Sequence, residues 1–238
     1  MKIEQLNWDS EFFGIKIGRV IIADKINFDP IKFTEQVIEE RFELVYVFSL
    51  NKILPDSKIK MANIELMDIM LTMSKKFNSH GDFRYELRTE LLEEELNDCY
   101  NIAEEISVVS RFYREEKIGP IKTKKFYRKW IDNALNQSFS DGLFLSKVNQ
   151  NISGVHMVKT DEVNGIGHCS IIGVRADYKG QGIGKNLWEQ AYNYWTDKNI
   201  HKCIVPFSIQ NIDSFNFHLK IGFDKIEEIK YIYHYRKG

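Results

Sequence analysis

The sequence predicts an α/β protein with a mixed, mostly antiparallel central sheet flanked by helices, and a smaller α/β unit ahead of it. Three consecutive β-rich runs in residues 142–174, separated by turn residues, indicate an antiparallel meander. Residues 171–195 then predict a strand, a glycine-rich turn and an amphipathic helix, because the apolar spacing becomes helical behind the glycines. The first 89 residues show their own alternation of strand-like and helical segments.

The composition of the 238 residues, 43% hydrophobic and 28% charged, suits a soluble globular protein of one large or two small domains. A formal net charge of -1 argues against nucleic-acid binding, which needs a basic excess. No apolar run approaches the roughly 18 residues of a membrane span, and the N-terminus lacks a signal peptide's hydrophobic region, so we expect a cytoplasmic protein without a membrane partner. Cys99, Cys169 and Cys203 are odd in number and widely separated, so we expect buried free thiols and no metal site.

The first 89 residues predict the smaller unit. A helix is expected to begin at Asp29 and Pro30, because Asp caps a helix and Pro fits its first position. We place the boundary near Thr89, which gives one domain at residues 1–89 and a second at residues 90–238. The strand-like runs of this unit cover residues 17–22, 42–49, 64–72 and 83–88.

The second domain is expected to begin with helices. A charged helix is expected from residue 91 to Ser110, and apolar spacing predicts another at residues 126–135 with Trp130 facing the core. Residues 202–207 predict a short strand behind the glycine-rich turn. The strands of the meander are expected at residues 143–145, 152–158 and 167–174.

The glycine-rich turn at residues 179–185 predicts a phosphate site. Glycines let the backbone approach a ligand, and the first amides of the following helix lack partners within it, so they can bind an anion. A Rossmann fingerprint would need glycine at Lys185 or Leu187. A Walker A loop would need glycine at Lys179 and Ser or Thr at Asn186. Spacing excludes both nucleotide loops and leaves an ordinary strand-to-helix loop as the alternative.

The remaining pattern resembles the pyrophosphate loop of the GNAT superfamily of CoA-dependent N-acyltransferases, Q/R-x-x-G-x-G/A behind a short strand. Lys179 stands in the Gln/Arg position, and Gly182 and Gly184 stand in the glycine positions. Residues 211–223 are similar to a second pattern of the family, N-x-x-A-x-x-x-Y-x-K-x-G-F, with Ser214 in place of Ala and His218 in place of Tyr. The resemblance covers roughly residues 90–238.

This resemblance implies a GNAT fold and acyl-CoA as co-substrate, either acetyl-CoA or a short 3-hydroxyacyl-CoA. Acyl transfer to an amine needs a neutral amine, a hydrogen-bond donor for the oxyanion and a proton for the departing thiolate. The family implies the Val174 amide as oxyanion donor and His218, in the Tyr position, as proton donor. Water or one of Tyr231, Tyr233 and Tyr235 is the alternative proton donor. The implied CoA-binding residues are Ile172, Gly173, Val174, Lys179, Gly180, Gln181, Gly182, Ile183, Gly184, Lys185, Asn211 and Phe217.

A base for the amine is suggested at His168, six positions before Val174, where some amine-acylating members of the family carry a histidine. Strand alternation is expected to place His168, Ser170, Ile172 and Val174 on one face. An unperturbed histidine pKa near 6.5 suits relay of an amine proton through water. The alternative is a hydrogen-bonded histidine on a half-buried strand.

Segments outside both motifs suggest the acceptor. Residues 8–14, the Ser110-Arg111-Phe112 segment and residues 127–131 are similar to the GNAT branch that includes dTDP-fucosamine N-acetyltransferase. Members of that branch pair a small N-terminal α/β domain with the transferase domain, and they N-acylate a dTDP-linked amino-deoxy sugar for surface polysaccharide biosynthesis. The resemblance therefore implies a nucleotide-sugar substrate, and we also expect a homodimer.

Arg111 lies beside two aromatic residues at the end of a predicted helix. A guanidinium there can pair with phosphate and stack on a base, whereas the alternative is a surface arginine beside core aromatics. Two other functions stay open: a GNAT enzyme for another amine, such as a polyamine, an antibiotic or a protein N-terminus, and a non-catalytic acyl-CoA sensor. The candidate acceptor-site residues are Ser110, Arg111, Phe112 and Tyr113.

Overall fold

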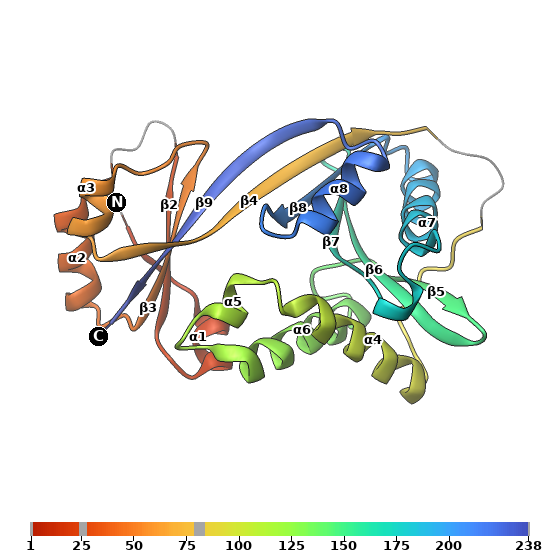
Figure 1. Cartoon of the computed structure of the whole chain (residues 1–238), viewed down its shortest axis with the longest axis horizontal. Coiled ribbons are helices and arrows are strands. Elements are labelled where there is room, and N and C mark those ends of the chain that lie inside the picture. The colour runs from red at the N-terminus through yellow and green to blue at the C-terminus, as the bar shows by residue number, and fades with distance from the viewer. Residues whose placement is uncertain (1, 24–27, 79–83, 238) are drawn as a thin grey trace.

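The computed structural model describes residues 2–23, 28–78 and 84–237. Its strands form one nine-stranded sheet in the order β1-β2-β3-β9-β4-β8-β7-β6-β5 (Figure 1). The pairs β2–β3 and β7–β8 are parallel and the other pairs are antiparallel, which confirms the predicted mixed, mostly antiparallel sheet. The strands are β1 (Glu4–Gln5), β2 (Ile17–Ile22), β3 (Leu44–Leu50), β4 (Ile64–Lys76), β5 (Gly142–Val148), β6 (Asn151–Asp161), β7 (Ile166–Val174), β8 (Lys202–Ser208) and β9 (Lys225–Arg236).

The helices flank this sheet, and the predicted ones are present with adjusted bounds. Asp29 caps α2 as expected, because its carboxylate accepts the amides of Ile31 and Lys32 at 3.1 and 3.2 Å. The helices are α1 (Asn7–Phe13), α2 (Pro30–Glu39), α3 (Asp56–Met61), α4 (Glu93–Ser107), α5 (Arg111–Arg114), α6 (Gly119–Leu135), α7 (Ile183–Asp197) and α8 (Ile212–Lys220).

The strand predicted at residues 83–88 is wrong for the part that the structure describes. Phe83 lies outside the described residues, and residues 84–88 form no strand beyond a single bridge between Arg88 and Leu143. The β-forming side chains serve packing instead, because Tyr85 and Leu87 pack on the hydrophobic cluster beneath α7. Tyr85 also donates to Asp197 at 2.8 Å.

The long strands β4 and β9 run through both parts of the chain (Figure 1). β4 belongs to the first 89 residues, yet it is hydrogen-bonded to β9 on one side and to β8 on the other. The last strand, β9, is paired to β3 as well, so the sheet is continuous from end to end. The division into residues 1–89 and 90–238 stays a prediction, while the shared sheet is what positions the two parts.

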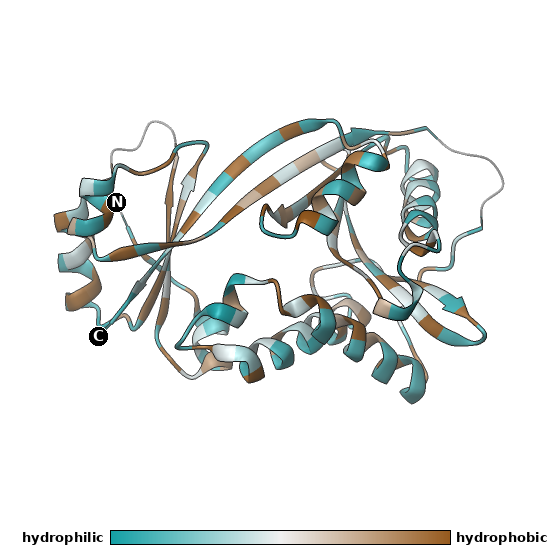
Figure 2. Cartoon of the chain, in the orientation of Figure 1, coloured by the Kyte–Doolittle hydropathy of each residue, from teal (hydrophilic) through white to brown (hydrophobic). Residues whose placement is uncertain are grey.

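Hydrophobic clusters cover both faces of the sheet. Figure 2 shows apolar and polar residues alternating along β4 and β9. Trp188 and Trp195 of α7 are buried against β7 and β8 on one face. Ile102 of α4 and Ile131 of α6 pack on β6 across the other face, and Trp130 packs beside them as expected. The three cysteines, Cys99, Cys169 and Cys203, are free and buried, as predicted.

Within the described ranges, no helix has the length and apolar composition needed to cross a membrane.

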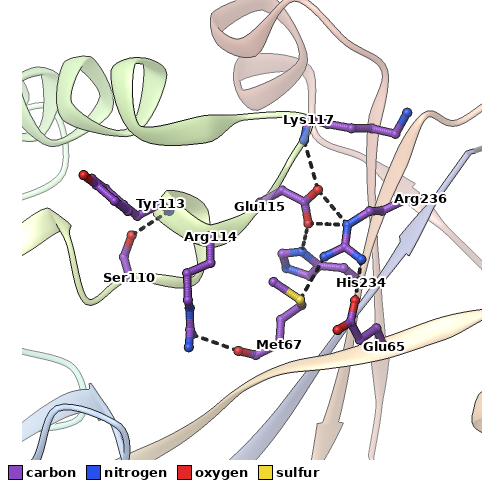
Figure 3. A network of polar contacts seen from close by, with 9 residues as sticks. All are labelled: Glu65, Met67, Ser110, Tyr113, Arg114, Glu115, Lys117, His234 and Arg236. Atoms are coloured by element: carbon purple, nitrogen blue, oxygen red, sulfur yellow. Dashed lines mark hydrogen bonds and ion pairs between the residues drawn. The ribbon is translucent and has the colours of Figure 1, made fainter.

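Glu115, at the end of α5, is the centre of a buried ionic network (Figure 3). Its carboxylate accepts hydrogen bonds from Nδ1 of His234 at 2.5 Å and from Nε of Arg236 at 2.9 Å. Arg236 also pairs with Glu65 of β4 at 2.6 Å. Burial alone would raise the pKa of Glu115, but hydrogen bonds from His234 and Arg236 outweigh it and lower that pKa to about 2. The network ties the α5–α6 turn to β9 and β4.

The buried histidines are expected to make the fold acid-sensitive. Burial lowers the pKa of His156 to about 3 and the pKa values of His218 and His234 to about 4, so each histidine binds a proton more weakly in the folded chain than in the unfolded chain. The free energy of unfolding should therefore fall as the pH drops from about 6.5 toward about 4, and this contribution should be fully present above about pH 7. Melting temperatures measured by circular dichroism across this range test the expectation.

A matched pair of variants isolates the histidine contribution. His156→Phe keeps a ring against Trp188 but removes one buried imidazole, so the acid slope of the melting temperature should decrease. His201→Gln changes an exposed histidine and should leave the slope unchanged. An identical slope in wild type and His156→Phe would contradict the assignment.

Candidate active site

The site is built around an opening between two parallel strands. β7 and β8 pair at Gly167 with Cys203 and at His168 with Ile204, near the beginning of both strands. Beyond that point the two described strands are no longer hydrogen-bonded to each other, and they separate toward Val174 and Ser208. Backbone groups on the facing edges are thereby free to bind a ligand.

A β-bulge at Ser170 changes which face each side chain of β7 occupies. Cys169 pairs with Val158 and Ile171 with Met157, so Ser170 is the additional residue on β7. Cys169 therefore lies in the cluster under α7, while Ile171 lies in the cluster under α4 and α6.

The predicted common face of His168, Ser170, Ile172 and Val174 is consequently wrong. Ile172 and Val174 pack toward α7, and a Cβ at Gly173 would lie 2.7 Å from Ile102 of α4, on the opposite face. Ahead of the bulge, Gly167 contacts Trp195 of α7, which turns His168 toward the α6 face. The extra residue reverses the alternation.

The Val174 amide points into the opening. Arg175 donates its amide to Ser153 of β6 at 2.9 Å. In an antiparallel pair the hydrogen-bonding direction alternates, so the N–H of Val174 turns away from β6 toward the side from which β8 has separated. The geometry is compatible with the predicted oxyanion donor, which stays a prediction.

The glycine-rich turn positions the first amides of α7. Gly180 and Gly182 have φ values of +79° and +81°, in the left-handed region that favours glycine, and α7 begins directly after Gly182. A Cβ at Gly184 would lie 2.9 Å from the ring of Phe217 on α8, so glycine permits the close approach of the two helices. The unpaired amides at this helix start suit a diphosphate.

A cavity of about 940 Å³ joins the turn, β7, α7 and α8. Gln181 is the exception among the predicted CoA-binding residues: it is exposed and donates to the carbonyl of Asp177 at 3.2 Å. Asn211 lines the cavity, but its side chain caps α8 by accepting the Ser214 amide at 3.1 Å. The remaining predicted residues line the cavity: Ile172, Gly173, Val174, Lys179, Gly180, Gly182, Ile183, Gly184, Lys185 and Phe217.

Sequence reasoning missed Lys75 of β4 and Ile106 of α4, which also line this cavity. Neither residue belongs to a motif, so no local signal could have found them. Their contribution follows from the position of β4 beside β8 and of α4 against β7.

His218 also lines this cavity, in an apolar setting. Its ring stacks on Phe207 with 5.3 Å between centroids, and Nδ1 lies 2.7 Å from the carbonyl oxygen of Ser214. Because the carbonyl can only accept, Nδ1 carries the proton, and the buried Nε2 has no partner among the described residues. Burial lowers the pKa of His218 to about 4, so Nε2 is an acceptor at neutral pH.

A second cavity, of about 1060 Å³, lies on the α6 side of the sheet and contains His168 and Trp130. His168 is half-buried, with Nε2 4.0 Å from Asp161, and desolvation lowers its pKa against the opposing effect of that carboxylate. The charged residues that line this groove are Lys159, Asp161, Glu162, Glu227, Glu228 and Lys230.

Arg111 lies between the two parts of the chain. Its guanidinium carbon is 4.1 Å from the ring centre of Phe112 and 5.3 Å from that of Tyr46, on β3. Its Nε is buried without a hydrogen-bond partner, and no ion pair joins it to a carboxylate among the described residues. The guanidinium is thus half-buried and forms no ion pair, although the carboxylates of Asp68 and Asp9 are close enough to oppose the lowering of its pKa by desolvation.

The neighbours of Arg111 have different environments. Ser110 caps α5 by accepting the Tyr113 amide at 3.3 Å. Phe112 is 6% exposed and packs in the core with Phe13 and Phe126, whereas Tyr113 is half-buried. Phe112 therefore supports the guanidinium and does not offer a face to solvent.

α5 lies at the open end of the β7–β8 opening. Nη2 of Arg114 donates to the carbonyl of Met67 at 2.9 Å, and Arg114 also contacts Gln210, just beyond β8. The next residue of β4, Asp68, accepts from Ser208 at the end of β8 at 2.5 Å. These contacts place the Arg111 segment beside the end of β8 where the strands have separated.

In the ranges that the structure describes, no group of three or more His, Cys, Asp or Glu side chains is arranged to hold a metal ion.

The chain matches the sequence profile of the acetyltransferase (GNAT) family over residues 90–223, more than half of its length. No curated protein sequence matches it.

Solved structures agree in fold. A conserved protein of unknown function from Staphylococcus epidermidis superposes with a TM-score of 0.61 at 12% identity, covering 94% of this chain and 85% of the other. A GCN5-related N-acetyltransferase from Sphaerobacter thermophilus superposes with a TM-score of 0.55 at 13% identity, covering 87% of this chain and 67% of the other. A GNAT-family acetyltransferase from Colwellia psychrerythraea superposes with a TM-score of 0.51 at 10% identity, covering 87% of this chain and 72% of the other. At these identities the similarity concerns the fold.

Gly182→Ala should weaken CoA binding. Alanine at a φ of +81° strains the backbone by roughly 1–2 kcal/mol or shifts the first amides of α7, so we expect the Kd for CoA to rise about tenfold. Gly165→Ala is the matched control, since Gly165 has a φ of +64° in the β6–β7 turn, away from the cavity. Isothermal titration calorimetry measures the Kd for CoA of both variants. Equal Kd values would refute the assignment of the glycine-rich turn as the CoA-binding loop.

Proposed function

The chain belongs to the acetyltransferase (GNAT) family and is a CoA-dependent N-acyltransferase, and we propose that its acceptor is the amino group of a dTDP-linked amino-deoxy sugar. The observation that carries this proposal is Arg111, a half-buried guanidinium that forms no ion pair with a described carboxylate and lies at the open end of the β7–β8 opening. Burying an unpaired charge is costly, so the site favours an acceptor that brings an anion. A diphosphate supplies that anion and matches the guanidinium fork.

The reaction proposed is direct transfer. The amine nitrogen attacks the thioester carbonyl carbon, the new C–N bond forms, and the C–S bond breaks. The amine loses one proton and the thiolate gains one. The Val174 amide would stabilise the oxyanion, because it points into the opening beside the CoA cavity.

The Arg111 region extends from β3 to the end of β8. The ring of Tyr46, on β3, contacts the guanidinium. Asp68, which accepts from Ser208 at the end of β8, is close enough to raise the pKa of Arg111. A nucleotide sugar offers separate base, phosphate and sugar groups to such a region, whereas a small amine does not.

The residues around the Arg111 guanidinium come from both parts of the chain. Tyr46 and Phe48 come from β3, in residues 1–89, and Arg111 comes from α5. We propose that the N-terminal part serves as the acceptor-binding unit of the enzyme. The homodimer and the role in polysaccharide biosynthesis are part of the same proposal and rest on the resemblance alone.

A small cationic amine is the second candidate. The groove that contains His168 carries four carboxylates, Asp161, Glu162, Glu227 and Glu228, against two lysines. Such a rim attracts a polyamine or an aminoglycoside more strongly than a diphosphate. Much of this charge is already neutralised, since Glu227 pairs with Lys202 and Lys225, and Glu228 pairs with Lys230. The nucleotide-sugar proposal is therefore preferred.

Thiol release from acetyl-CoA and a 3-hydroxyacyl-CoA tests the acceptor, with dTDP-amino sugars compared against simple amines. We expect turnover with a dTDP-amino sugar, and Arg111→Gln should raise the KM for it at least about tenfold without changing the KM for acyl-CoA. Arg128→Gln is the matched control, because Arg128 also lies over a ring, that of Tyr100, but is paired with Glu104. Turnover with simple amines alone would eliminate the nucleotide-sugar proposal.

His168 is proposed as the base, since the bulge turns it toward the α6-side groove. We expect kcat/KM to rise with pH through an inflection below about 6.5, the usual histidine pKa, because desolvation lowers the pKa of His168. His168→Ala should lower kcat at least about tenfold and remove that inflection. His201→Ala, at an exposed position, is the control. A pH profile with the same inflection in His168→Ala would exclude the role.

The predicted role of His218 as proton donor stays a prediction. It requires an imidazolium, whereas the described His218 has a pKa of about 4 and presents an acceptor at Nε2. Donation to the thiolate would therefore depend on a rise of that pKa when CoA binds. Water or one of Tyr231, Tyr233 and Tyr235 stays the alternative donor.

A further inference from the structure

Lys75 contributes a cation to the CoA cavity from outside both family motifs. It lies near the end of β4, where it pairs with Cys203 of β8, and its side chain lines the cavity. β4 belongs to the first 89 residues, ahead of the segment that matches the GNAT profile at residues 90–223. The family match therefore does not account for this lysine.

The contacts of Lys75 leave one N–H donor of its ammonium group without a partner among the described residues. Nζ donates to the carbonyl oxygen of Ile221 at 2.7 Å and lies 4.6 Å from the ring centre of Tyr192. An ammonium group has three N–H donors, so the carbonyl and the ring account for two of them. No other partner for Nζ occurs among the described residues.

The other lysines near the α7 start differ in this respect. Lys179 pairs with Asp213 at 3.9 Å, and Lys185 pairs with Glu189 at 3.8 Å. Lys75 is half-buried and has no carboxylate partner among the described side chains. Desolvation lowers its pKa more than the carboxylates of Glu189 and Asp224, which form no ion pair with it, raise that pKa. An anion in the cavity would supply a counter-charge in direct contact.

We propose that Lys75 binds the 3′-phosphate at the adenosine end of CoA. The diphosphate of CoA fits the amides at the beginning of α7, and Tyr192, the ring beneath Lys75, is nine residues further along that helix. At 1.5 Å per residue this is about 13 Å from Ile183, too far for the same phosphates to reach both. The 3′-phosphate is the remaining phosphate group of the cofactor.

Gly222 lies beside Lys75 in the wall of the cavity, two residues beyond the end of α8. Its φ of +92° favours glycine, and a Cβ there would lie 3.5 Å from the Lys75 side chain, at van der Waals distance. The competing explanation is that Lys75 only caps the C-terminal end of α8 through the Ile221 carbonyl.

Calorimetric titration with CoA and with 3′-dephospho-CoA separates these explanations. The two ligands differ by the proposed phosphate alone, and neither titration needs an acceptor, so the result is independent of the nucleotide-sugar proposal. We expect wild type to bind CoA at least about tenfold more tightly than 3′-dephospho-CoA. Lys75→Met should bring this ratio to about one while leaving the affinity for 3′-dephospho-CoA unchanged, and Lys75→Arg should preserve the preference.

Two further variants keep the test decisive. Lys75→Gln removes the charge but retains an N–H group for the Ile221 carbonyl, so it replaces Lys75→Met if that variant does not fold. Lys220→Met removes an exposed lysine of the same cavity and should retain the wild-type ratio.

An unchanged ratio of the two affinities in Lys75→Met and Lys75→Gln would overturn the proposal. Equal loss of affinity for both ligands would also overturn it, because it would mean that Lys75 acts by capping α8. Loss of the ratio in Lys220→Met alone would place the phosphate on Lys220.

Discussion

The separation of β7 from β8 is the constraint on which the site depends. Two paired positions hold the strands together, and beyond them β7 stays paired with β6 but is no longer paired with β8. The bulge at Ser170 is a second feature of β7: beyond it, the side chains at even-numbered positions lie on the opposite face of the sheet from those before it. Ile172 and Val174 then face the α7 cavity, while His168 faces the α6 groove. β7 thereby lines the cavity on the α7 side and the groove on the α6 side with residues at most six positions apart.

The N-terminal part is built into this arrangement through hydrogen bonds of the sheet. β4 is hydrogen-bonded to β8 on one side and to β9 on the other. Near its C-terminal end, β9 is joined to the α5–α6 turn by the hydrogen bonds of His234 and Arg236 to Glu115 (Figure 3). Removing one member of such a buried network leaves an uncompensated charge, so the turn that follows Arg111 is firmly positioned. From the same half of the chain, Lys75 lines the cavity beside α7 and the ring of Tyr46 contacts Arg111.

Local signals in the sequence were sufficient for many of the helices and strands and for the glycine-rich turn, although the strand predicted at residues 83–88 was wrong and β9 was not predicted. The meander, the capped helix at Asp29 and the glycines of the turn depend on neighbours a few residues away, and each was placed correctly. The common face of β7 was predicted wrongly because a bulge depends on the partner strand and leaves no periodic mark of its own. Lys75 was missed for a similar reason: its position follows from β4 pairing with a strand that lies about 130 residues later, as with Cys203.

His218 and His168 differ in burial, and this difference decides which of them can take up and release a proton. His218 is enclosed by Phe207, Trp188 and Phe223, and its Nδ1 proton is held by a carbonyl, so its free nitrogen accepts. His168 lies in an open groove beside Asp161, which favours its charged form against desolvation. A residue that must take up and release a proton in each turnover needs both charge states near neutral pH, and solvent access with a nearby carboxylate provides them. On that physical criterion His168 is better suited than His218 to carry the proton from the amine.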